Sequence, residues 1–103
     1  MIMLIIKKLA KQIREELHDA EKYARGAHEL RTDYPAVAAV YAKLAEQELD
    51  HAGMLHEQVV KLIDKASAEK PVPPVMTELW KWQHDEMVEE EKEVRLLLDM
   101  YRR

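Results

Sequence analysis

The chain has 103 residues, of which 35% are charged, with a formal net charge of −4, two glycines and no cysteine. This length suits one small domain, the missing cysteines exclude disulfides, zinc ribbons and iron–sulfur clusters, and the acidic balance argues against a nucleic-acid partner. The apolar start at residues 1–6 is far shorter than the roughly 20 residues that span a bilayer, and it lacks the basic region of a signal peptide. We therefore expect one cytoplasmic domain over residues 1–103, without a membrane partner, whose apolar start packs in a core or a subunit contact.

Apolar residues recur in steps of three and four along three segments, which is the period of an α-helix. We expect the first helix at about residues 3–30, the second at about 35–66 and the third at about 75–101. The short connection at residues 32–35 makes the first two helices antiparallel neighbours. Residues 70–74 hold most of the prolines and form a stiff connector. The predicted fold class is all-α, a long antiparallel αα-hairpin with a third C-terminal helix.

Ionisable residues interrupt the apolar stripes of the first two helices. Glu48 and His51 occupy stripe positions of the second helix, and Glu16 occupies one in the first. A carboxylate buried without a partner costs several kcal/mol, so either a metal ion or an ion pair with a lysine should compensate it. The Glu-x-x-His spacing is weak evidence by itself, because Glu15 and His18 match it on the polar face of the first helix.

The hairpin predicts that these three stripe residues meet. With Asp33 as the turn centre, Glu16 lies 17 residues before it (33 − 16), and Glu48 and His51 lie 15 and 18 residues after it (48 − 33 and 51 − 33). Residues equidistant from the turn of an antiparallel hairpin lie at one height, about 25 Å from the turn here. The same reasoning on the looser second connection places Glu90 and Glu91 near that level. For these two, a solvated face and a place beside the site remain equally open.

The remaining aromatic, histidine and glycine residues have ordinary structural interpretations. Taken alone, Tyr23 is a packing residue with a solvated hydroxyl. Gly26 costs about 1 kcal/mol inside a helix relative to alanine, which the close approach of another backbone would explain. Three histidines without an acidic partner at helical spacing are expected on the surface: His28, His56 and His84. Four large residues are expected in a core or an interface: Trp80, Trp82, Met87 and Met100.

Glu16 on one helix and Glu48-x-x-His51 on the next resemble half of a ferritin-like di-iron site, which uses one Glu from each of two helices and a Glu-x-x-His from each of two others. The flanking Ala45 and Ala52 are similar to the alanine-rich surroundings of that motif. Tyr23, seven residues after Glu16, is similar to a tyrosine of rubrerythrins and short encapsulated ferritins. The resemblance covers about residues 13–63, with one copy of the motif and no rubredoxin cysteines.

The resemblance implies that two chains complete a four-helix bundle as a homodimer. Two copies each of Glu16, Glu48 and His51 would then bind two irons between the protomers. Carboxylates with few imidazoles suit iron or manganese. The implied activity is oxidation of Fe(II) by O₂, a ferroxidase-type oxidoreductase with Tyr23 close to the site. The alternative is a metal-free helical assembly or interaction module on the same scaffold.

The sequence leaves four points of this interpretation open. They are the physiological metal, the choice between iron storage and peroxide handling, ring or cage assembly, and a host shell protein as partner. No evident encapsulation tail follows the third helix.

Overall fold

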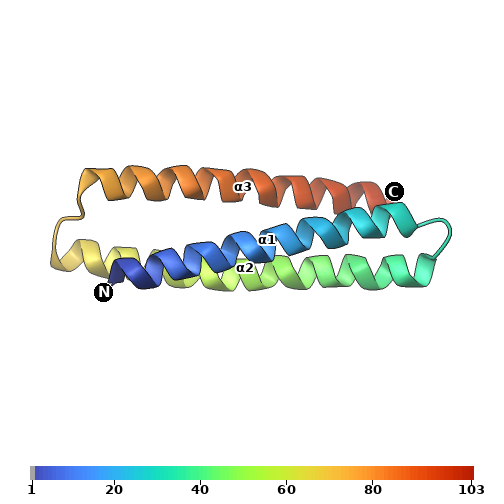
Figure 1. The fold of residues 1–103 in the computed structure, drawn as a ribbon, viewed down its shortest axis with the longest axis horizontal. Helices are drawn as coiled ribbons and strands as arrows, with labels where there is room; N and C mark the ends of the chain where they lie inside the picture. Colours follow the sequence, from blue (N-terminus) through green and yellow to red (C-terminus); the bar gives the residue numbers. More distant parts are fainter. Residues whose placement is uncertain (1) are drawn as a thin grey trace.

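The computed structural model describes residues 2–103, so Met1 of the apolar start lies outside the described residues. It contains three long helices, α1 (Ile2–Leu30), α2 (Pro35–Glu69) and α3 (Pro74–Arg102). They lie side by side in an elongated molecule of 56 × 18 × 16 Å, with α1 between α2 and α3 in the view of Figure 1. The predicted all-α class with three helices is confirmed. The second helix runs three residues beyond the expected residue 66.

Local chemistry sets the ends of the helices. Pro35 opens α2, where its missing N–H would have no helical acceptor. The N–H of Tyr34 donates to the carbonyl of Leu30 at 2.9 Å, which closes the tight turn after α1. Lys70 ends α2 in an extended conformation with φ −161° and ψ 136°, as the following proline requires. Each connection is four residues long, residues 31–34 and 70–73, and the second begins and ends in an extended conformation.

The core is centred on α1, which packs against both other helices, while α2 and α3 touch at few places. Small residues line the contact between α1 and α2, and several are completely buried: Ala20, Ala24, Ala27, Ala38 and Ala45. Larger buried side chains fill the remaining core: Ile13, Leu17, Val59, Met87, Val94 and Leu98. Because alanines have little side chain, the α1 and α2 backbones can approach closely. Long side chains at the margins of this contact can therefore reach one another.

Gly26 lies on α1 against the ring of Tyr41 from α2. A Cβ added at Gly26 would lie 2.7 Å from Cδ2 and 2.9 Å from Cε2 of that ring. The close neighbour is thus an aromatic side chain and not the backbone that we expected. Tyr41 in turn packs against Tyr23, with 5.8 Å between the ring centroids.

One edge of the α1–α2 pair is left open in the single chain. We define this open edge by Ile5 and Glu16 on α1 and by Val37, Val40 and His51 on α2. Its three apolar side chains are 47%, 44% and 56% exposed at Ile5, Val37 and Val40. Elsewhere on the apolar start, Ile6 is buried whereas Leu4 is exposed. Within residues 2–103, no helix is long and apolar enough to cross a membrane.

Candidate metal centre

Glu16, Glu48 and His51 come together at the seam between α1 and α2. Each offers one ligand atom, a carboxylate oxygen or an imidazole nitrogen, and these atoms all lie within 4.8 Å of one another. Nδ1 of His51 lies 3.5 Å from Oε2 of Glu16 and 3.9 Å from Oε2 of Glu48. The convergence that the hairpin predicted is therefore present in the structure.

The three side chains differ in exposure. The side chain of Glu48 is 19% exposed and that of Glu16 is 29% exposed, whereas that of His51 is 54% exposed. The two carboxylates are thus partly desolvated in the seam, and the imidazole closes the group on its solvent side. An ion or a second protein surface can reach the group from the open edge.

Protein cations do not balance the two carboxylates. Among the ion pairs of residues 2–103, no lysine or arginine contacts Glu16 or Glu48. The lysine pair considered from the sequence is therefore absent from this part of the chain, and the only partner is His51, which is charged only when protonated. Oxygen and nitrogen ligands with net negative charge suit iron or manganese. The residues present fit a divalent cation better than an internal ion pair.

Tyr23 lies two helical turns beyond Glu16 on the same side of α1. Its half-buried ring packs against Tyr41 with an interplanar angle of 45°. Gly26 contacts Tyr41, and Tyr41 contacts Tyr23. These contacts form a continuous packed region between α1 and α2. Any influence of Tyr23 on Glu16 would act along this face of α1.

The two acids of α3 join other groups. Glu90 lies with His18 and Glu21, whose ligand atoms are also within 4.8 Å of one another. Burial raises the pKa of Glu90, and the nearby charge of Glu21 raises it further. Glu91 accepts hydrogen bonds from Arg95 at 2.8 and 3.1 Å. The structure brings neither Glu90 nor Glu91 into the group of Glu16, Glu48 and His51.

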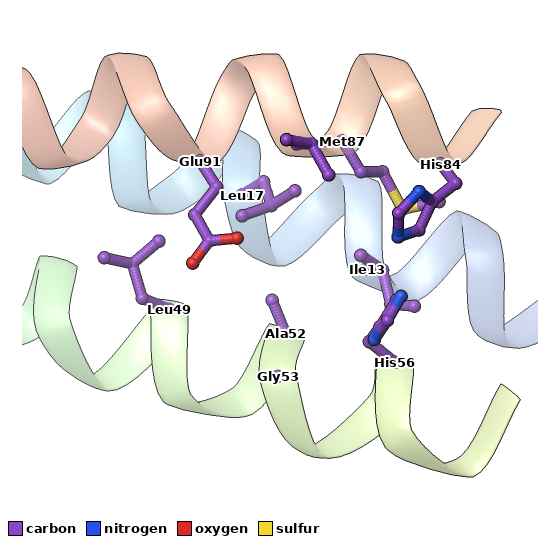
Figure 2. A pocket seen from close by; sticks show the side chains of 10 residues that line it. Ile13, Leu17, Leu49, Ala52, Gly53, His56, His84, Met87 and Glu91 are labelled. Carbon is purple, nitrogen blue, oxygen red and sulfur yellow. The ribbon is translucent and has the colours of Figure 1, made fainter. Parts of the chain in front are cut away.

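Sequence reasoning overlooked two histidines, His56 and His84. We expected these two and His28 on the surface, but all three are half-buried. His56 and His84 line a cavity between α2 and α3 (Figure 2). The signal was present, because His56 lies in a buried stripe of α2 with Ala52 and Val59 at steps of four and three. His84 lies three residues before the buried Met87 and so shares its face of α3.

The helical hairpin brings two carboxylates and an imidazole together. This arrangement corresponds to half of the site in di-iron carboxylate bundles. A family model described as Rubrerythrin matches residues 7–102. The chain therefore belongs to the rubrerythrin family of the ferritin-like di-iron superfamily. The match confirms the resemblance drawn from residues 13–63 and extends it across α3. Searches of curated proteins and of solved structures found no match.

Proposed function

We propose that two copies of the chain pair through the open edge, bind two iron ions between them and oxidise Fe(II) with O₂. One observation carries this proposal: three ligand atoms from two helices lie within 4.8 Å of one another at an edge that α3 does not cover. A single chain offers one Glu and one Glu-x-x-His, which is half of the ligand set of a ferritin-like site. A two-fold dimer presents the same edge twice and so completes the set.

The apolar residues of the open edge support pairing at this place. Val37 and Val40 share the face of α2 that carries Glu48 and His51, and Ile5 shares the face of α1 that carries Glu16. All three apolar side chains are more than 40% exposed in the single chain. Removing such apolar surface from water favours association. Pairing through this edge would also remove the ligands from bulk water.

The chain's own residues would act as follows on Fe(II), the substrate. Glu16 and Glu48 would bind the ions through carboxylate oxygens, and His51 through a ring nitrogen. The iron supplies one-electron chemistry, and O₂ accepts the electrons. Because the two carboxylates carry negative charge without a protein cation, they favour the extra positive charge of Fe(III). A protonated imidazole cannot bind a metal, so binding should weaken at acidic pH.

The central experiment measures iron content and native mass after anaerobic loading with Fe(II). The test variant is Glu48→Gln with His51→Gln, and the control is Glu57→Gln, which makes the same neutralisation at an exposed position of α2. We expect a wild-type dimer with two irons, retained by the control and lost in the test variant. Rapid Fe(II) oxidation on adding O₂ should follow the same pattern.

Three outcomes would contradict the proposal. Equal iron content in the wild type and the test variant would exclude Glu48 and His51 as ligands. A wild-type monomer that still oxidises Fe(II) rapidly would exclude a shared site. A dimer without bound iron or Mn(II) would favour the metal-free interaction module instead. Parallel loading with Mn(II) compares the two candidate metals directly.

A further inference from the structure

Another set of side chains that can bind a metal lies on the other side of α2, around the cavity between α2 and α3. The cavity has a volume of about 110 Å³ and is lined mainly by apolar side chains such as Ile13, Leu17 and Met87. Three side chains in its lining can bind a metal, namely His56 from α2 and His84 and Glu91 from α3. Figure 2 shows the two rings next to each other between α2 and α3, whereas the Glu91 carboxylate enters the cavity farther along α3, near Leu49.

The two imidazoles are close and held by aromatic packing. Their ring centroids are 5.0 Å apart with an interplanar angle of 34°. Trp80 stacks on His56 at 6.2 Å and lies 6.0 Å from His84. Nε2 of His56 is buried, and no protein atom of residues 2–103 forms a hydrogen bond with it. An unsatisfied buried polar atom costs about 1–3 kcal/mol, so this nitrogen should have a partner.

The electrostatics of the cavity favour the neutral imidazole of His56. Burial lowers the pKa of His56, the neighbouring His84 lowers it further, and Glu91 opposes the effect. A neutral imidazole has a free nitrogen lone pair, which is the form that binds metals. A cation placed between the rings would also attract the Glu91 carboxylate.

We propose that this cavity binds one divalent first-row transition-metal ion through His56, His84 and Glu91. Two imidazoles and one carboxylate are a donor set that such metals accept readily. The cavity has room for the ion with water, since one water needs about 10–15 Å³ of comparable volume. Both hydrogen bonds from Arg95 go to Oε1 of Glu91, so Oε2 is available to an ion.

Binding requires the ligands to move, because His84 and Glu91 are seven residues apart on α3, about 10 Å along the helix axis. Within residues 2–103, these three side chains are not among the groups whose ligand atoms lie within 4.8 Å of one another. The sparse contact between α2 and α3 allows the side chains to draw together around an ion. A bound ion would link α2 directly to α3, and binding to the folded chain alone raises its stability by mass action.

This site is separate from the group of Glu16, Glu48 and His51. His51 and His56 are five residues apart on α2, so they point about 140° away from each other around the helix. Loss of one site should therefore leave the other intact, and the two proposals can fail independently.

Fluorescence of Trp80 offers a local readout for the ion. The chain has two tryptophans, and Trp82 is 57% exposed, so Trp82→Phe leaves Trp80 as the only one. The background also carries Glu48→Ala and His51→Ala, which removes the first metal site. In this background, titration with Ni(II) should quench Trp80 fluorescence with saturation at one ion per chain, and Zn(II) should raise Tm.

Variants of the cavity decide the test. In that background, His84→Gln and Glu91→Gln should each weaken Ni(II) binding at least tenfold and reduce the Zn(II)-dependent rise in Tm. The matched control is His28→Gln, which changes another half-buried histidine with a buried ring nitrogen on α1 and should change neither readout. Circular dichroism without metal checks that each variant folds, and Glu91→Gln decides the test if His84→Gln does not fold.

Two results would overturn the proposal. One is the absence of saturable Ni(II) quenching in the background that lacks Glu48 and His51. The other is quenching that remains unchanged in folded His84→Gln and Glu91→Gln, which would place the ion elsewhere.

Discussion

Replacing Gly26 with alanine tests the contact between α1 and the Tyr41 ring. In an unobstructed helix interior, this change stabilises the folded protein by about 1 kcal/mol. Here the new Cβ would lie 2.7 and 2.9 Å from two ring carbons of Tyr41, against an optimum of about 3.5–4.0 Å. The ring must retreat by about 1 Å, and such overpacking costs about 1–3 kcal/mol. We therefore expect Gly26→Ala to lower the free energy of unfolding by up to about 2 kcal/mol.

A double-mutant cycle isolates this contact. In a Tyr41→Ala background the obstacle is gone, so Gly26→Ala should stabilise by about 1 kcal/mol. The coupling energy between the two positions should then be about 1–3 kcal/mol. Urea unfolding monitored by circular dichroism measures all four proteins, at one fixed protein concentration in case pairing contributes to stability. The steric argument is refuted if Gly26→Ala stabilises both backgrounds equally.

Three further predictions concern the open edge, α3 and the core. Val40→Glu should weaken the proposed dimer at least tenfold, which corresponds to about 1.4 kcal/mol, as measured by native mass spectrometry. Helix content should not fall, because Val40 is 56% exposed in the single chain. An unchanged dimer would contradict pairing through the open edge. Glu90→Gln should stabilise the folded chain at pH 7 by less than about 1 kcal/mol, because burial and the charge of Glu21 raise the pKa of Glu90, which means that the fold disfavours the ionised carboxylate. This gain should vanish well below the ordinary pKa of 4.5, where Glu90 is protonated in both the folded and the unfolded protein. Glu89→Gln, at an exposed position, is the control. Val59→Ala should lower the free energy of unfolding in urea by about 2 kcal/mol, since Val59 is fully buried. Val60→Ala should lower it much less, because Val60 is 39% exposed.

The convergence of Glu16, Glu48 and His51 could be predicted because it depends on local rules. Helical periodicity sets the face of each residue, and the short turn at residues 31–34 sets the relative height of α1 and α2. The structure places the three ligand atoms within 4.8 Å of one another, as that arithmetic requires. Whether they bind iron remains a prediction.

The position of α3 could not be obtained in the same way. Counting residues from Pro71 predicted Glu91 near the level of His51, and Glu91 does line a cavity with Leu49 and Ala52. The count gives no information on the rotation of α3 about its own axis. In the structure, Glu90 lies beside His18 and Glu21, and Glu91 faces the cavity. His84 meets His56 because the rotation of α3 turns both side chains toward the same cavity. The residues that we assigned to the surface therefore include two that form a half-buried pair of imidazoles.

The sequence by itself determined three helices, an antiparallel hairpin and one half of a carboxylate–imidazole site. These features follow from apolar periodicity and from one tight turn, which act over short distances along the chain. The tertiary structure decided which edge of the hairpin stays uncovered and which side chains of α3 face α2. Packing of Met87, Val94 and Leu98 in the shared core fixes these features, because burial of apolar surface, and not the connector, sets the rotation of α3.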